Sequence, residues 1–459
     1  MSSLNSDRSG TRARGRPRTT ETAGASLVEI LNLVRTGRAT TRQDIERIGE
    51  FGRAVVTDRL GILAETGLLD ERELGAASGG RAPRRVRFVA DRGRVLVATL
   101  TQAAVGVGVA DLSGRLLMEH HEAADLTAPP AAILERLLAL FDWILSRRGP
   151  TSATPWGVSV SVPTPVAGGD EGAFLTHTPP ILPGWDDVPF VETLTRRYRA
   201  PVWMRSSVET MTMGELHEGA GVGHRTMLFV KVGQRIGAGL ISEGRLYRGA
   251  LGATGLIGQM PVQSDGRTGT LDALAGSEMI AREGRAAVDE GRSPILADIE
   301  RRQGGLGAAE VSQAAQMGDA VAIDILSRSG RLIGQVVATL ANMLNPEVIV
   351  LSGSVAQSND ILLAAVREAV YGASHPLVTR DLRIVRSQMG SSAGLVGSAA
   401  IAVEGMFAPL VLKDWILAGH PSGHPGLASP LADRGRPSAS HLAASGDGPH
   451  LAAPGDGPP

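Results

Sequence analysis

The sequence contains no cysteine among its 459 residues, so disulfides are excluded and any metal site would rely on His, Asp or Glu. It has no uninterrupted apolar run near the roughly 20 residues of a membrane helix, and no apolar N-terminal stretch typical of a signal peptide. A large net charge is also lacking, because 46 basic residues face 47 acidic ones. These absences predict a cytoplasmic protein that meets charged partners through local patches.

The composition is that of a globular protein, with 43% hydrophobic residues and a length that suits two or three domains. Four segments differ in character: a polar, arginine-rich arm at 1–24, short helical patterns at 25–89, a large α/β segment at 90–411, and a Pro/Gly/Ala-rich tail at 412–459. The arm and the tail offer too little apolar surface to fold, so we expect both to be disordered.

The segment 25–89 has the pattern of a winged helix-turn-helix. A first helix carries Leu27, Ile30, Leu31 and Val34 on one face, and Thr41 is a good N-cap for a short second helix. A third helix is expected from about Arg53 to Thr66, followed by two strands that flank a loop at residues 79–81, the wing. An ordinary three-helix packing unit with solvated arginines is the alternative.

In a helix-turn-helix, the N-terminal part of the third helix faces the base edges of the major groove. Arg53 and Thr57 are the candidates there, with Arg59 nearer the DNA backbone. On the wing, Arg81, Arg84 and Arg85 are expected to neutralise phosphates or enter the minor groove. The predicted partner is therefore a double-stranded DNA operator.

The N-terminal arm contains a second candidate DNA contact. Arg14, Arg16 and Arg18 alternate with Gly15 and Pro17, which matches the core of an AT-hook. Such a segment lies in narrow A·T-rich minor grooves, where the negative potential attracts arginine. A generic electrostatic arm is the equal alternative.

Glycine-rich motifs follow apparent strands throughout the segment 90–411. They lie at residues 179–185 (PPILPGW), 228–241 (LFVKVGQRIGAGLI), 244–250 (GRLYRGA), 344–353 (LNPEVIVLSG) and 390–399 (GSSAGLVGSA). In this order, behind a helix-turn-helix, they resemble the ROK family of repressors and sugar kinases, from about Leu27 to Ala408. The resemblance implies an actin-like (ribonuclease H-like) α/β fold of two lobes with a cleft between them.

The resemblance also implies that the kinase chemistry is lost. It places the first phosphate loop on residues 99–103, which lack the acid, glycine and threonine of that loop. The second loop reads Gly-Gln-Arg-Ile-Gly at 233–237, with an arginine where a small residue belongs. The family's catalytic Asn-Asp pair falls on Ser206 and Ser207, and serine without help is no base near neutral pH. We therefore expect no enzyme activity and no cofactor.

The family's zinc site and sugar pocket are altered as well. Its histidine falls on Gln259, and its cysteine segment has become residues 263–270, so we expect no metal. The pocket glutamate falls on Leu256, whereas Trp185 matches the family pattern, with a role in packing as the alternative. The candidate effector pocket thus consists of Trp185, Ser206, Ser207, Leu256 and Gln259. It would bind a less polar effector, or the domain would serve dimerisation only.

The sequence as a whole predicts a homodimeric or tetrameric transcriptional regulator, by default a repressor of carbohydrate-related genes. A sugar kinase with an accessory DNA-binding domain is the first alternative. A non-enzymatic scaffold that uses its winged helix for protein contacts is the second.

Overall fold

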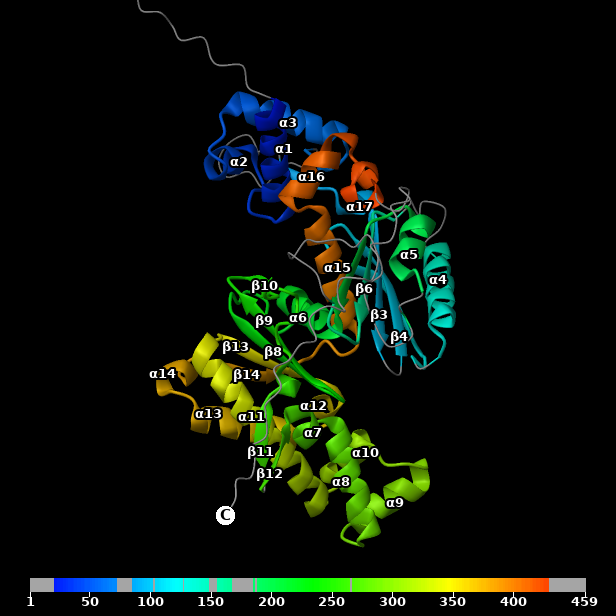
Figure 1. Ribbon diagram of the computed structural model, residues 1–459. Helices are drawn as coiled ribbons and strands as arrows, with labels where there is room; N and C mark the ends of the chain where they lie inside the picture. The colour runs from blue at the N-terminus through cyan, green and yellow to red at the C-terminus, as the bar shows by residue number, and fades with distance from the viewer. Residues whose placement is uncertain are drawn as a thin grey trace, which may run out of the picture.

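The computed structural model describes residues 20–71, 85–101, 104–126, 128–147, 155–166, 185, 188–264 and 266–428, with side chains from Gly24 onward. Figure 1 shows a group of N-terminal helices beside two larger lobes, each built on a β-sheet. This mixed α/β architecture confirms the predicted fold class.

The N-terminal group has helices and strands in the order expected of a winged helix. They are α1 (Thr20–Arg35), α2 (Arg42–Ile48), α3 (Arg53–Glu65) and an antiparallel pair of β1 (Leu69–Asp70) with β2 (Arg87–Phe88). Thr41 Oγ1 accepts a hydrogen bond from the Asp44 amide, and the Asp44 carboxylate accepts one from the Thr41 amide. This is the predicted capping box. Val56, Leu60 and Leu63 of α3 are buried against α1, as the apolar spacing predicted.

The small lobe has a five-stranded sheet in the order β5-β4-β3-β6-β7. Its strands are β3 (Arg94–Thr101), β4 (Ala104–Asp111), β5 (Leu116–Ala123), β6 (Gly157–Val162) and β7 (Val202–Ser206). Because side chains alternate along β3, Leu96, Ala98 and Leu100 face α4 (Pro130–Ser146) and α5 (Phe190–Tyr198). Val95 and Val97 point to the opposite face and belong to a different core.

The large lobe has a second five-stranded sheet, in the order β10-β9-β8-β13-β14. Its strands are β8 (Met227–Val232), β9 (Ile236–Ser242), β10 (Arg245–Tyr247), β13 (Val348–Ser352) and β14 (Arg383–Arg386). The face that carries Leu228 and Val230 is covered by helices, among them α8 (Ser277–Asp289), α11 (Ala320–Leu344) and α13 (Ile361–Ala373).

Smaller elements complete the large lobe. They are η2 (Ile257–Gln259), the hairpin of β11 (Pro261–Ser264) and β12 (Arg267–Thr270), α7 (Leu271–Ala275), α9 (Pro294–Gln303), α10 (Ala308–Gln316), α12 (Ser354–Ser358) and α14 (Pro376–Thr379). In Figure 1 the hairpin and α8 to α10 lie at the end of the molecule farthest from α1.

Helices α6 (Ser207–Glu218) and α15 (Ser392–Met406) form the connection between the parts. Their backbones touch, since a Cβ on Gly397 would lie 1.6 Å from the Thr210 carbonyl oxygen and one on Gly214 would lie 2.1 Å from that of Ala393. α15 packs on β3 and β6 of the small lobe and ends at Phe407, beside α1. One hydrophobic core therefore runs from the N-terminal helices through α15 to both sheets.

Two predicted boundaries require correction. Helix α1 begins at Thr20, so the predicted arm at 1–24 overlaps it. The predicted tail at 412–459 also begins too early, because α16 (Pro409–Trp415), η3 (Ile416–Ala418), η4 (Pro421–Gly423) and α17 (Pro425–Ala428) continue the fold. Trp415 and Ile416 are buried there, and α16 packs on α1. The predicted tail is rich in Pro, Gly and Ala as a whole, and this composition outweighed the few large apolar residues at its start.

Among the described residues, no single helix is long and apolar enough to cross a membrane. α15 together with Pro409–Ala418 reaches that length only as a pair bent by 67°.

Candidate functional site

The start of α3 presents an open polar surface. Gly52 is its N-cap and supplies no side-chain hydrogen bond, and Arg53 and Thr57 one turn later are both exposed. Arg53 has no recorded partner among the described residues. Thr57 receives a long hydrogen bond of 3.5 Å from Arg42 Nη1. These two predicted contacts therefore lie together on one accessible face.

Arg42 is a neighbour that the sequence analysis missed. Its guanidinium donates to both carboxylate oxygens of Glu71, with Nε at 2.9 Å from Oε1 and Nη2 at 2.6 Å from Oε2. The hydrogen bond that Arg42 donates to Glu71 raises the pKa of Arg42, which stays charged beside Thr57. Its position directly after the Thr41 cap, at the start of α2, was the available signal.

Arg59 lies in a different environment from Arg53. Its side chain is only 13% exposed, donates from Nε to Ser26 Oγ at 2.9 Å and is paired with Asp58. The guanidinium is thus used to join α3 to α1, and its predicted contact with the DNA backbone is not supported.

The wing is described only in part. Arg85 is exposed and forms an isolated antiparallel bridge with Thr41, which brings the base of the wing to the start of α2. The other predicted contacts, Arg14, Arg16, Arg18, Arg81 and Arg84, lie outside the described residues.

Between the lobes, the N-terminus of α6 is built into a buried ionic network. Ser206 Oγ accepts from the amide of Glu209, and the Glu209 carboxylate accepts from the amide and hydroxyl of Ser206, both at 2.9 Å. The other oxygen of Glu209 accepts from Arg248 Nε at 2.6 Å, and both side chains are at most 10% exposed. Ser206 is therefore occupied as a helix cap.

Arg248 also joins the two lobes. It follows β10 of the large lobe, and its Nη2 donates to the carbonyl of Val166, after β6 of the small lobe, at 3.1 Å. Arg205 lies near this pair. Burial, together with repulsion from Arg248, lowers the pKa of Arg205 to about 10, although Glu209 opposes the shift.

Ser207, where the resemblance places the kinase base, has an unexpected partner. Lys231 on β8 donates from Nζ to Ser207 Oγ at 2.9 Å. Burial lowers the pKa of this ammonium. In the sequence, Lys231 is visible only as one residue of the glycine-rich motif at 228–241. We call Ser206, Ser207, Glu209, Lys231 and Arg248 the interlobe site.

The remaining predicted pocket residues do not join this site through any recorded contact. Trp185 is 2% exposed and stacks on Phe190 at 5.8 Å in the core of the small lobe, so it is a packing residue rather than an effector contact. Gln259 donates to Asp272 of α7 at 3.0 Å, and Leu256 is exposed in the loop before η2. Ser206 and Ser207 thus lie together at the start of α6, whereas Trp185 packs inside the small lobe.

The segment that carries the family's zinc cysteines forms the hairpin β11–β12 without them. Its strands pair from Pro261 with Thr270 to Ser264 with Arg267, and Gly266 supplies the positive φ of 73° at the turn. Among the described residues no three His, Asp or Glu side chains gather as metal ligands. Backbone pairing and the anchor between Gln259 and Asp272 hold the loop shape.

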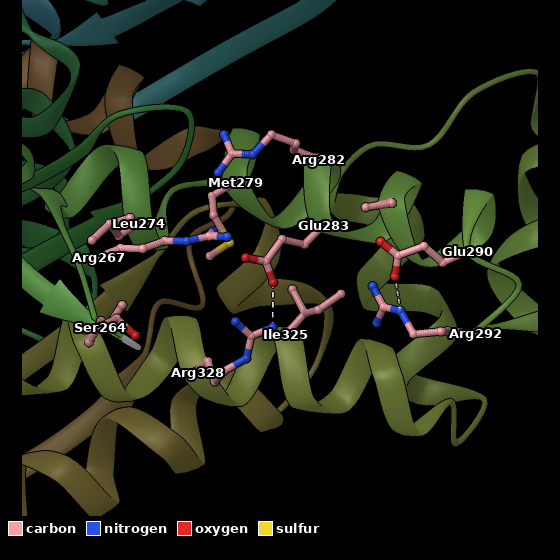
Figure 2. A pocket seen from close by; sticks show the side chains of 12 residues that line it. Ser264, Arg267, Leu274, Met279, Arg282, Glu283, Glu290, Arg292, Ile325 and Arg328 are labelled. Carbon is pink, nitrogen blue, oxygen red and sulfur yellow. Dashed lines mark hydrogen bonds and ion pairs between the residues drawn. The ribbon is translucent and has the colours of Figure 1, made fainter.

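A separate cavity of about 520 Å³ lies between this hairpin, α8 and α11. Figure 2 shows Arg267 reaching from the hairpin toward Met279 and Glu283, while dashed lines join Glu283 to Arg328 and Glu290 to Arg292. The cavity is cationic but has its own carboxylates. It lies on the helix-covered face of the large-lobe sheet, opposite the face that carries Lys231.

Comparison with known proteins places this geometry in a family. The model of the ROK family matches residues 102–404. A glucokinase from Halalkalibacterium halodurans is 31% identical over 49% of this chain and 69% of its own length. A xylose repressor from Caldicellulosiruptor bescii is 22% identical over 82% of this chain and 95% of its own. The solved structure of a ROK family transcriptional regulator, a homolog of the E. coli MLC protein, superimposes with a TM-score of 0.71 and 19% identity, over 86% of this chain and 99% of its own.

Proposed function

This chain belongs to the ROK family, and on that premise we propose that it is a sequence-specific DNA-binding transcriptional regulator. The observation that carries the proposal is the accessible face of α3, where Arg53 and Thr57 stand beside the charged Arg42. The similarity to a xylose repressor over 82% of this chain supports it, since the kinase similarity covers 49%. We infer that the regulated genes concern carbohydrates and that repression is the default action.

The proposed DNA interface is the start of α3 together with the wing. Arg53 and Thr57 contact base edges, while Arg42, Arg85 and the arginines of the wing, Arg81 and Arg84, neutralise phosphates. The arm with Arg14, Arg16 and Arg18 adds contacts in the minor groove or a general electrostatic attraction. A homodimer or homotetramer places such surfaces on symmetric half-sites.

We also propose that the lobes perform no phosphoryl transfer. A sugar kinase needs a carboxylate base beside the attacking hydroxyl. At that position Ser207 accepts a hydrogen bond from an ammonium, and the nearby carboxylate of Glu209 is held by Ser206 and Arg248. Ser207 is bound to an ammonium and Glu209 is neutralised by Arg248, so neither group serves as the base.

The experiment for DNA binding is selection of genomic fragments by the full-length protein at low and at physiological salt. Recovery of one palindromic site at both salt concentrations is the expected result, since base contacts survive screening better than phosphate contacts do. Arg53→Ala is the matched variant, because its side chain touches nothing else that is described. Sequence-blind recovery that disappears with salt would contradict the proposal.

The experiment for catalysis is incubation of the protein with ATP and a panel of hexoses and N-acetylhexosamines. No sugar-dependent release of ADP is expected. Turnover that disappears in Ser207→Ala would instead identify the chain as a sugar kinase with an accessory DNA-binding domain.

A further inference from the structure

Lys231 is an unusual residue for this chain. The sequence contains only two lysines, Lys231 and Lys413, and its other basic residues are arginines. Met227 and Phe229 of β8 belong to the core that also contains α6 and α15, and alternation places Lys231 on that same face. Lys231 thus presents a compact ammonium toward the other lobe, where an arginine would present a broad planar fork.

The charge of Lys231 is not compensated by the residues around it. Burial is the one cause that lowers its pKa, and no carboxylate among the described residues opposes that effect. An ammonium has three N–H donors, and the recorded hydrogen bond to Ser207 Oγ uses one of them. A partly buried cation bound to a single neutral hydroxyl is costly unless something negative joins it.

The neighbours of Lys231 in the sheet carry no charge. Register pairs it with Gly237 of β9 on one side and with Ser352 of β13 on the other. Gly237 has no side chain, and Ser352 is fully buried with a hydroxyl that has no hydrogen-bond partner among the described residues. The N-terminus of the twelve-residue helix α6 adds a positive partial charge beside Ser207. Positive charge therefore gathers here, and the acceptor that the described residues show for the ammonium is the neutral Ser207 hydroxyl.

We propose that Lys231 and Ser207 bind the anionic oxygen group, carboxylate or phosphate, of a small effector. A neutral sugar is a poor match, since it offers hydroxyls where the site presents a desolvated cation. The kinase base position has thus become an anion site through exchange of a carboxylate for an ammonium. This inference rests on the proposed regulatory function only in calling the ligand an effector.

The test is isothermal titration of the full-length protein with inorganic phosphate, glucose 6-phosphate, gluconate and, as the neutral control, glucose. We expect one or more of the anions to bind and glucose not to bind. Preference for gluconate or for the phosphates distinguishes the two sources of negative charge. In Lys231→Met, binding should weaken about tenfold or more, because a charged hydrogen bond is lost. Lys231→Arg should retain part of the affinity.

Arg282→Ala is the matched control, because Arg282 lines the separate cationic cavity on the opposite face of the sheet. Loss of anion binding in Arg282→Ala with retention in Lys231→Met would overturn the proposal. Binding of glucose with no anion binding, or no binding of any probe, would overturn it too.

Protein stability provides a second readout that needs no ligand. Lys231→Met should unfold at an equal or higher temperature than the parent protein at neutral pH, because a desolvated charge is removed, while the anion-induced rise in Tm disappears. A lower Tm with an unchanged anion-induced rise would show that Lys231 is only structural. DNA affinity of the same samples without anion tests the proposed function separately, since anion binding is measured in the absence of DNA.

Discussion

Two helices begin at the surfaces to which we assign function, and their N-termini are built in opposite ways. Helix α3 starts at Gly52 without a side-chain cap and leaves Arg53 and Thr57 exposed. Helix α6 starts at Ser206 with a full capping box, and its first turn is sealed by the buried pair of Glu209 and Arg248. An exposed first turn suits a large polyanion, which supplies its own hydrogen bonds.

The sealed first turn of α6 fixes geometry instead. Glu209 holds the helix cap, the strand that precedes it and the loop after β10 at once, so one charged side chain sets the relative position of three segments. Lys231 lies beside that network, and no carboxylate in the part of the chain that the structure describes opposes the effect of its burial. In such a site, the protein's own hydrogen bonds and ion pairs occupy most polar groups, and the few that are left select the small ligand.

The largest expected effect comes from breaking the sealed terminus. Glu209→Ala removes the cap partner of α6 and the carboxylate to which Arg248 Nε donates. The free energy of unfolding should fall by about 3–5 kcal/mol, as for other buried pairs that lose one partner. Urea denaturation measures it. Addition of Arg248→Met should recover part of the loss, and a single variant as stable as the parent would show that the network is unimportant.

The next effect is expected in the segment that follows α16. His424 in this segment is 1% exposed, its ring lies 5.7 Å from that of Trp203, and burial lowers its pKa from 6.5 to about 4. The unfolded chain therefore binds the proton more readily, and stability should fall by roughly 3 kcal/mol as the pH drops from 7 to 4.

Thermal unfolding between pH 7 and pH 4 measures this dependence. His424→Leu serves as the control, since it has no proton to bind and should lose that part of the pH dependence. Equal pH profiles in the two proteins would contradict the assignment.

A smaller effect is expected at the open terminus. Arg53→Ala should weaken operator binding by roughly 1–3 kcal/mol and relax sequence preference at one position, with stability unchanged. Arg59→Ala should lower stability and leave the sequence preference unchanged, because the Arg59 guanidinium donates to Ser26 inside the domain. Fluorescence anisotropy with operator variants, alongside thermal unfolding of both proteins, separates the two outcomes. Loss of specificity in Arg59→Ala alone would reverse the assignment.

The smallest effect concerns the arm. Deletion of residues 1–18 should weaken binding at low salt and flatten the dependence of log K on log salt, while the preferred operator sequence stays the same. Anisotropy titrations at several salt concentrations measure the slope. An unchanged slope would exclude the arm from the DNA interface.

The sequence predicted the fold class and the helices of the N-terminal group, because apolar spacing and the Thr41 cap are local signals. The resemblance to the ROK family placed the position of the kinase base on Ser206 and Ser207, and the absence of kinase activity stays a prediction. The sequence could not predict the role of Lys231, since the contact with Ser207 joins residues 24 positions apart on different elements. The sequence also could not show that the side chains of Arg59 and Trp185 are turned into the fold, because exposure depends on how the whole molecule packs.

The direct backbone contact between α6 and α15 also has a mechanical consequence. A helix of fifteen residues is about 22 Å long, so a tilt of ~5° at its interlobe end moves the other end by about 2 Å. With glycine at the crossing, no side chain can absorb such a tilt by changing rotamer. α15 thus crosses α6 near its own start, beside the interlobe site, and its far end lies beside α1. A tilt of the helix would therefore move the end at α1 most. In a two-fold assembly the displacement would double, and the distance between paired α3 helices would follow the state of the lobes.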